Sequence, residues 1–161
     1  MYVNFDLLPD TSRVWIYQAD REFNELEIDQ ISNKLYTFVT NWKRHGDDLQ
    51  ASFKIEYNQF IVLSVNEMYN DVSGCSIDAS VHIIKDLENE FGLDLLNKMN
   101  VSFKDGININ TVSLKNFKEY VKQNKITANT VVFNNMINSK ADFKSLWEVE
   151  ASKSWHAKFL V

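Results

Sequence analysis

Residues 51–65, which read ASFKIEYNQFIVLSV, constrain the fold of this chain more than any other stretch of its sequence. Apolar and polar residues alternate strictly over 51–57, a pattern typical of a β-strand with one face in water. Residues 60–65 are almost all apolar, which predicts a strand covered on both faces. Only two residues separate the runs, so we expect an antiparallel hairpin. The residues expected to be exposed are Ser52, Lys54 and Glu56, and those expected to be buried are Phe60–Leu63.

A capping box marks the start of a helix ahead of this hairpin. Asn24 is expected as the N-cap, with Glu27 three residues on and apolar residues following at helical spacing. Basic residues before Gly46 suit the negative end of a helix dipole, so the helix is predicted to end there. The other expected elements are a strand over 13–19, a helix after the loop 66–74, a hairpin around Asp105-Gly106, a helix over 113–124, a strand over 130–133, a helix starting at Ser139 and terminal helical turns over 154–159.

The order of the first elements, strand, helix, strand, strand, helix, predicts the fold class. It is typical of an α+β protein in which helices pack on one face of an antiparallel sheet. We expect a ferredoxin-like core, a split βαβ unit, completed by a strand from 101–103 or 107–109 and followed by an extra C-terminal hairpin and helices. No linker or repeat divides the sequence, so residues 1–161 are predicted to form a single domain.

Composition and charge narrow the range of functions. The longest unbroken apolar run, Phe60–Leu63, is far shorter than the roughly 20 residues of a membrane-spanning helix, and the first residues lack the features of a secretory signal. A net charge of -5 disfavours nucleic acid and anionic lipid as partners. The single cysteine excludes an internal disulfide and a multi-cysteine zinc site. We therefore expect a cytoplasmic protein with no membrane contact, metal or cofactor.

The stretch SGCSID, residues 73–78, places the one cysteine of the chain at a predicted helix start. The positive end of a helix dipole favours a thiolate, which makes Cys75 a candidate nucleophile. Activation also needs a base within hydrogen-bond reach. His82 lies about 10 Å further along the helix axis, so only His45 or His156 could serve. The other interpretation is a small side chain that fills a tight turn, and we expect Cys75 to be buried and slow to react.

The same stretch is a candidate anion site that does not need the thiol. Backbone N–H groups at a helix start and nearby hydroxyls can bind a phosphate or a carboxylate. Ser76 is equally explained as a helix N-cap, and Asp78 with His82 as an exposed ion pair. The candidate ligand-binding residues are Ser73, Gly74, Ser76 and Asp78.

Lysines recur at positions 115, 118, 122 and 125 of the helix predicted over 113–124 and just beyond it, opposite its apolar residues. Such a stripe can dock an acidic partner or a nucleic-acid backbone. Most lysine stripes, however, are simply the solvated face of a helix.

Several stretches of the sequence resemble one family. TNWKRHGDDLQASF, FIVLSVNE, SGCSID and the SW at 154–155 are together similar to small uncharacterised bacterial proteins often labelled "ABC transporter ATPase". An ATPase of that kind needs a Gly-rich loop ending in Gly-Lys-Ser/Thr, and here none of the four glycines precedes a lysine. The resemblance therefore implies a small cytoplasmic bacterial protein, and it assigns neither an activity nor a site residue.

Together these features favour a binding protein over an enzyme. Our first interpretation is a non-catalytic α+β domain that binds a partner protein or a small anionic ligand at residues 66–78. The alternative is a cysteine-dependent enzyme or redox-responsive protein that uses Cys75. The positions of His45 and His156 relative to the sulfur discriminate between the two, because a reactive thiol needs an imidazole or similar base beside it.

Overall fold

The computed structural model describes residues 1–160, which divide into two compact units. Unit 1 comprises residues 1–96 and 138–141, and unit 2 comprises residues 97–137 and those from 142 onward. Each unit has its own sheet and its own hydrophobic core. The strand ladders are antiparallel and helices accompany them, so the chain belongs to the α+β class, as expected. That the whole chain forms a single domain stays a prediction.

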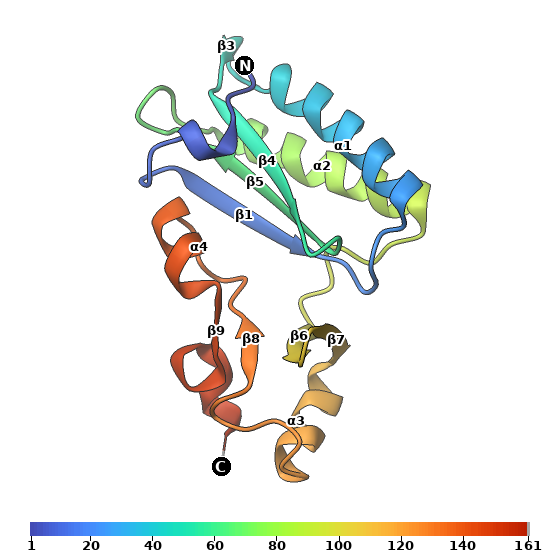
Figure 1. Cartoon of the computed structure of the whole chain (residues 1–161). Helices are drawn as coiled ribbons and strands as arrows, with labels where there is room; N and C mark the ends of the chain where they lie inside the picture. Colours follow the sequence, from blue (N-terminus) through green and yellow to red (C-terminus); the bar gives the residue numbers. More distant parts are fainter. Residues whose placement is uncertain (161) are drawn as a thin grey trace. The chain divides into compact units, whose positions relative to one another are not determined.

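Unit 1 is built on a sheet in the order β1-β5-β4, formed by β1 (Arg13–Gln18), β5 (Phe60–Val65) and β4 (Ala51–Glu56). β5 pairs antiparallel with both neighbours, so β1 and β4 run in the same direction on either side of it. α1 (Glu25–Thr40) and α2 (Gly74–Phe91) lie on one face of this sheet (Figure 1). Buried residues from the helices and the sheet form the core of the unit, among them Ile31, Leu35, Ile61, Leu63, Ile84 and Leu87.

The hairpin predicted over residues 51–65 is confirmed in its antiparallel pairing. Its register places Glu56 opposite Phe60 at the turn, and Phe60–Leu63 are fully buried. The loop begins one residue earlier than expected, at Tyr57, where the backbone is left-handed with φ of 51°. β5 is therefore the covered central strand that its apolar composition predicts.

One face of β4 differs from the expectation. Ser52, expected to be exposed, is fully buried, and Lys54 and Glu56 are half-buried. A short N-terminal turn, η1 (Phe5–Leu7), covers part of this face, because the Lys54 ammonium lies 5.1 Å from the centre of the Phe5 ring. Alternation assigns side chains to the two faces of a strand, but it does not reveal which distant segment covers the polar face.

A buried lysine fixes the N-terminal turn in place. Lys140 is 5% exposed, and its ammonium donates to the carbonyl oxygens of Phe5, Asp6 and Leu8 at 2.9, 3.2 and 2.7 Å. The residues beside it pair with the outer edge of β1. Three acceptors match the three N–H donors of the ammonium, so its hydrogen-bonding capacity is fully used.

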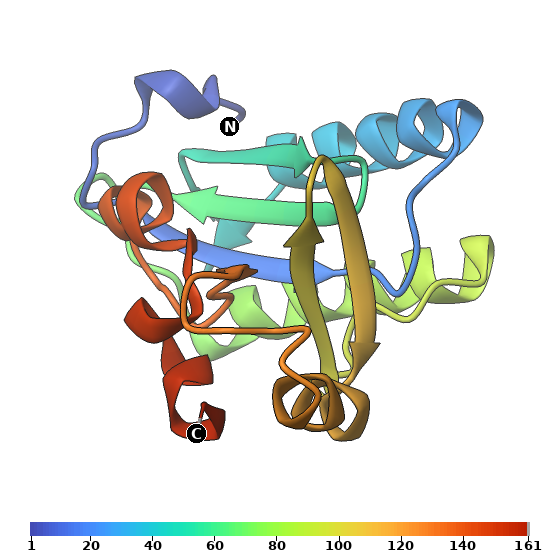
Figure 2. The ribbon, with the colours of Figure 1, turned by 60° about the horizontal axis from the view of Figure 1, so that its bottom comes forward.

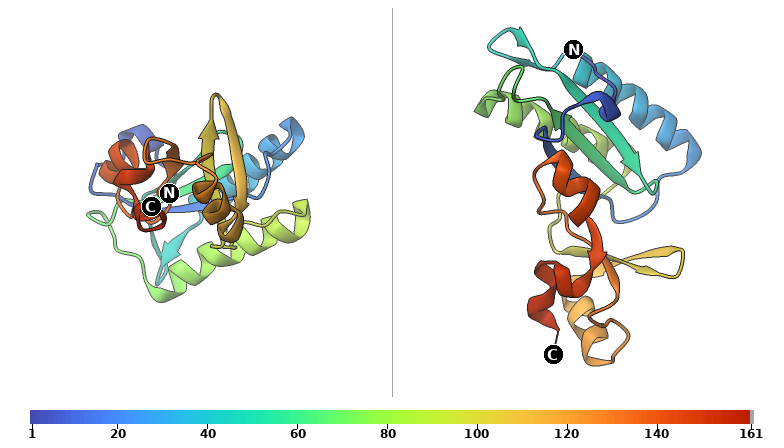
Figure 3. Two further views of the ribbon diagram at one scale, coloured as in Figure 1. Left: turned by 90° about the horizontal axis from the view of Figure 1, so that it is seen from below. Right: turned by 60° about the vertical axis from the view of Figure 1, so that its left-hand side comes forward.

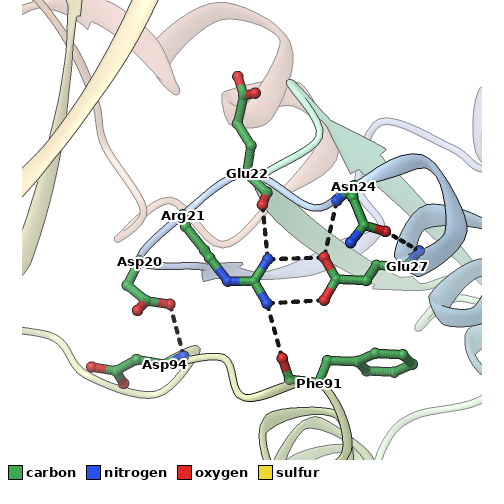
Figure 4. Close-up of polar contacts among 7 residues, drawn as sticks. All are labelled: Asp20, Arg21, Glu22, Asn24, Glu27, Phe91 and Asp94. Atoms are coloured by element: carbon green, nitrogen blue, oxygen red, sulfur yellow. Dashed lines mark hydrogen bonds and ion pairs between the residues drawn. The ribbon is translucent and has the colours of Figure 1, made fainter.

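α1 begins as predicted, with a complete capping box. The Asn24 side chain accepts the Glu27 N–H at 2.8 Å, while Glu27 Oε1 accepts the Asn24 N–H at 2.9 Å. Arg21 donates to both carboxylate oxygens of Glu27 and to the carbonyl oxygen of Phe91 at the end of α2 (Figure 4). Hydrogen bonds from Arg21 and Asn24 lower the pKa of Glu27 to about 2. The network ties the start of α1 to the end of α2.

The end of α1 differs from the prediction. The helix ends at Thr40 instead of continuing to Gly46. A short hairpin follows it, formed by β2 (Lys43–Arg44) and β3 (Asp47–Asp48). His45 and Gly46 close this hairpin with left-handed backbone, at φ of 49° and 89°. The basic residues read as a helix end therefore belong to the first strand and turn of the hairpin.

Unit 2 contains a separate sheet in the order β7-β6-β8-β9. The hairpin around Asp105-Gly106 is confirmed, and Gly106 adopts the left-handed backbone that its turn requires, with φ of 63°. β6 pairs with β8 through Phe103 and Val132, so the expectation that this hairpin completes the first sheet is wrong. A local turn signal predicts that the two strands on either side of it pair with each other. It does not predict which other strand each of them pairs with. The strands are β6 (Asn100–Asp105), β7 (Asn108–Ser113), β8 (Val131–Phe133) and β9 (Glu148–Glu150).

One helix of unit 2 packs on this sheet. α3 (Leu114–Lys122) begins at the predicted N-cap, Ser113, and its buried Phe117 ring lies 6.4 Å from that of Phe103. Figure 2 shows α3, in orange, at the base of the β6–β7 hairpin. No helix within residues 1–160 has the length and apolar character needed to cross a membrane. The remaining elements are α4 (Lys140–Leu146) and two 3-10 turns, η2 (Ala151–Lys153) and η3 (Trp155–Phe159).

Candidate functional site

The predicted site lies at the first turn of α2. Ser73 is the N-cap, and its Oγ accepts the Ser76 N–H at 3.2 Å. Ser76 is buried, and its hydroxyl donates to the Lys43 carbonyl at 2.9 Å. Gly74 is exposed, and a Cβ added there would meet nothing within 4 Å. The helix start therefore presents Gly74 to solvent, whereas Ser73 is half-buried and bonded to Ser76, and Ser76 is held inside by protein contacts.

The β2–β3 hairpin packs against this helix start. The Trp42 indole N–H donates to the carbonyl oxygen of Ser76 at 2.9 Å, beside the contact between Ser76 and Lys43. These contacts bring the backbone of β2 against the first turn of α2, which has no acidic residue. The Arg44 guanidinium reaches Asp71 in the loop just before this helix. One cationic side chain, Arg44, thus lies beside the loop that leads to the positive end of the helix dipole, and negative charge near both is favourable.

Acidic residues offset part of this positive charge. The Lys43 ammonium lies 3.6 Å from Asp48, and Arg44 Nη1 lies 4.0 Å from Asp71. The Arg44 side chain is 38% exposed, and its buried Nε has no hydrogen-bond partner among residues 1–160. Arg44 therefore keeps donor capacity that the described protein atoms do not use.

The expectation that Cys75 is buried is wrong. The thiol is free and exposed, and it forms no hydrogen bond to any residue that the structure describes. α2 turns Ser76 and Ser80 toward the interior, in line with the buried Ile84. Since Cys75 precedes Ser76 by one position, about 100° around the helix, it faces outward. Apolar residues on either side of a cysteine in sequence do not show whether that position of the helix faces the core.

The candidate bases lie in different surroundings. His45 is exposed in the turn between β2 and β3. His156 is fully buried in unit 2, where its Nδ1 lies 2.8 Å from Ser154 Oγ and its ring stacks on Trp155 at 3.7 Å. Burial lowers the pKa of His156 to about 4. Neither histidine forms a hydrogen bond with Cys75 in the described part of the chain.

The second predicted feature of the α2 start, an ion pair between Asp78 and His82, is not formed. Both side chains are exposed, and the structure records no ion pair between them within residues 1–160. A spacing of four residues permits such contact, but exposed pairs gain little from it. Asp78 lies beyond the exposed first turn, so it contributes negative charge close to the place where an anion would bind.

The lysine stripe of α3 is present, and it borders two cavities that sequence reasoning missed. All four lysines are exposed, opposite the buried Phe117 and Val121. One cavity, of about 770 Å³, lies where the β6–β7 hairpin extends beyond α3, and it is lined by residues such as Tyr120, Asn110 and Lys125. The other, of about 380 Å³, includes Lys122 and Leu160 in its lining. Cavities of this kind form between segments that are distant in sequence, so no local sequence pattern predicts them.

Unit 1 has a shallow groove of about 530 Å³ between α1 and α2, lined in part by Phe38 and Ile83. Among residues 1–160 no group of three His, Cys, Asp or Glu side chains is placed to hold a metal ion. A scan against protein-family models, a search of curated proteins and a search of solved structures found no match to this chain. The candidate sites therefore rest on geometry alone.

Proposed function

We propose that this protein is a non-catalytic binding domain whose site is the start of α2 together with the loop before it, residues 66–78. The observation that supports this most is the packing of the β2–β3 hairpin on that helix start, together with the Arg44 guanidinium, which lies 4.0 Å from Asp71 in the loop before the helix. The first N–H groups of a helix have no partner within the helix, so they bind anions readily. The ligand carries a phosphate or a carboxylate.

Exposed side chains in the adjoining loop support a protein as the bearer of that anion. Met68 and Tyr69 are 77% and 55% exposed, although both side chains are large and apolar. Tyrosine and methionine are enriched in protein interfaces because they bury a large area. A partner protein that presents an acidic or phosphorylated side chain would contact the helix start with its anion and this loop with its apolar surface.

An NMR titration tests the proposal. Inorganic phosphate and an acidic peptide are added separately to the 15N-labelled protein, and the amide signals of residues 73–76 are followed. We expect these signals to shift on saturation, and Arg44→Gln to weaken binding about tenfold because it removes a charged donor. Lys34→Gln is the matched control, since Lys34 is similarly exposed but pairs with Glu90 on another surface. Unchanged signals with both probes, or equal losses in both variants, would contradict the proposal.

A second candidate function rests on the exposure of Cys75. An accessible thiol at a helix N-terminus suits a redox-responsive protein or a cysteine-dependent enzyme. His45, which lies in unit 1 like Cys75, is also exposed. Oxidation with hydrogen peroxide followed by mass spectrometry tests this candidate. A sulfenic acid that forms in the wild type and forms more slowly in His45→Gln would favour it over the binding proposal.

We further infer a ferredoxin-like core in unit 1 and a cytoplasmic bacterial protein of the family that the sequence resembles. Support for the core comes from β5, which lies between β1 and β4 as in a split βαβ unit, with α1 as the crossover helix. A fourth strand is lacking from this sheet within residues 1–160, although residues 138–140 pair at the edge of β1. The purified protein is expected not to hydrolyse ATP. Phosphate release that is lost on substitution of one of its own residues would contradict that expectation.

A further inference from the structure

We propose that unit 2 binds single-stranded nucleic acid on a surface formed by α3 and the C-terminal turn η3, on which the lysines are exposed and the rings are half-buried. We call this surface the lysine–aromatic surface. The phosphates would contact its lysines and the bases would contact its rings and the adjoining cavity. Its residues are Lys118, Lys122, Lys125, Lys158, Tyr120 and Phe159.

Contacts between α3 and η3 make this surface continuous. The ammonium groups of Lys118 and Lys158 lie 4.8 and 5.0 Å from the centre of the same ring, Phe159. The right-hand view of Figure 3 shows the C-terminal turns beside α3. One turn along α3 from Lys118, Lys122 borders the cavity of about 380 Å³. Lys125 follows, with its ammonium 5.3 Å from the centre of the Tyr120 ring, at the edge of the larger cavity.

The charge of unit 2 differs from that of the whole chain. The chain carries a net charge of -5, but lysines outnumber acidic residues within unit 2. On α3 the one acidic residue is Glu119, which accepts a hydrogen bond from Gln123 at 3.3 Å. The net charge disfavours nucleic acid only if the charge is evenly spread. A local basic surface attracts phosphates over distances of about the Debye length, roughly 10 Å at 0.1 M salt.

The aromatic rings and the larger cavity favour nucleic acid over an acidic peptide. Single-stranded nucleic acids bind where basic side chains alternate with rings on which bases stack. The cavity of about 770 Å³ is large enough for a nucleobase, and Phe103 and Tyr120 form part of its wall. Asn110 and Asn129 also line it, and the amide of asparagine can bond the edge of a base. An acidic peptide would use the lysines but has no need of the rings or the cavity.

Fluorescence anisotropy with the full-length chain tests the proposal. The probe is a fluorescein-labelled single-stranded RNA of about 12 nucleotides, within the usual site size for such proteins. The test variant combines Lys118→Gln, Lys122→Gln and Lys125→Gln. We expect this variant to bind at least tenfold more weakly at low salt. The plot of log affinity against log salt should also become less steep by about 2, since each lost phosphate contact contributes about 0.7 to the steepness. The control, Lys34→Gln, Lys54→Gln and Lys85→Gln, changes the charge equally in unit 1 and should leave the slope unchanged.

A second variant separates stacking from charge. Phe159→Leu keeps an apolar side chain but removes the ring that Lys118 and Lys158 cover, and we expect about fivefold weaker binding with an unchanged salt slope. Circular dichroism checks that both variants are folded. Three results would overturn the proposal: no binding of the wild type at about 50 mM salt, equal losses in the unit 1 control, or equally tight binding of a polyglutamate peptide, which would make the partner an acidic protein.

Discussion

The sheets of unit 1 and unit 2 differ in how completely their strands are paired and covered. In unit 1 the central strand β5 pairs along its whole length with two neighbours, and two long helices cover one face. In unit 2 the strands β8 and β9 have three residues each, and β6 meets β8 at a single residue pair. Acidic residues outnumber basic ones in unit 1, whereas lysines prevail in unit 2. The cavity beside Tyr120 in unit 2 has about 770 Å³, against about 530 Å³ for the groove between α1 and α2 in unit 1.

This difference suggests a division of roles. A fully paired sheet with a closed core is difficult to remodel, because most of its polar backbone groups and apolar side chains are already satisfied. Short strands, cavities and unneutralised lysines leave groups available for a ligand. Binding sites also tend to occur in the less stable parts of a protein. On this view unit 1 is the scaffold, with one exposed helix start, and unit 2 is the more adaptable surface.

The largest expected effects on stability come from substitutions that create a cavity in either hydrophobic core. Leu63→Ala in unit 1 and Phe117→Ala in unit 2 should lower the free energy of unfolding by about 2 to 5 and 3 to 5 kcal/mol, because both side chains are fully buried. Urea unfolding followed by circular dichroism measures the loss. Leu146→Ala, at a half-exposed position, is the control and should cost far less.

Hydrogen exchange on the same variants tests whether the units are independent. If they are, Phe117→Ala should speed amide exchange in unit 2 and leave β5 protected. Faster exchange in both units would mean that they unfold together, as the single-domain prediction requires.

The next largest effect is expected from pH and is confined to unit 2. Burial lowers the pKa of His156 to about 4. Below pH 6.5 this histidine is therefore protonated in the unfolded chain but stays neutral in the folded chain until the pH approaches 4. Stability should be unaffected above pH 6.5 and should fall by about 3 kcal/mol as the pH drops from 6.5 to 4. Urea unfolding across this range measures the loss. His45→Gln should keep this pH dependence, whereas His156→Gln should remove it; a loss that persists in His156→Gln would assign it to other groups.

Local sequence signals predicted much of unit 1. The capping box at Asn24 and Glu27 and the hairpin over 51–65 depend on residues that are neighbours along the chain, and the structure confirms the box and the antiparallel pairing but not the exposed face of β4. Ser52 is fully buried and Lys54 lies against Phe5 of η1, and no strand pattern encodes either fact. The partner of β6 likewise depends on Val132, far along the sequence.

The candidate sites were harder to predict than the fold. A helix start within residues 73–78 was expected, but the N-cap is Ser73 instead of Ser76, Ser76 is buried, and Cys75, expected to be buried, is exposed. A shift of one position along a helix is enough to turn a side chain from the core to solvent. The lysines of α3 were visible in the sequence. Their proximity to Phe159 and to the cavity near Tyr120 needed tertiary contacts.

A smaller effect is expected at the junction of α1 and α2 in unit 1. Glu27→Gln removes the charge that Arg21 and the capping box share, so it should lower stability by about 1 to 2 kcal/mol at pH 7. The depressed pKa of Glu27 stabilises the folded state above pH 4.5, and this contribution disappears as the pH falls toward 2. The variant and the wild type should therefore converge in stability near pH 2, as measured by thermal unfolding. A constant difference across this range would show that the lost packing, not the charge, explains the cost.

The smallest effect on stability is expected at Cys75. Because the thiol is exposed and has no hydrogen bond among the described residues, Cys75→Ser should change the free energy of unfolding by no more than about 0.5 kcal/mol. The same exposure means that a thiol reagent should label the native protein at a rate close to that of the urea-unfolded chain. Labelling followed by mass spectrometry measures both rates, and Cys75→Ser gives the blank. Slow native labelling would mean that another part of the protein covers the helix start, and the α2 site would then be unavailable to a ligand in solution.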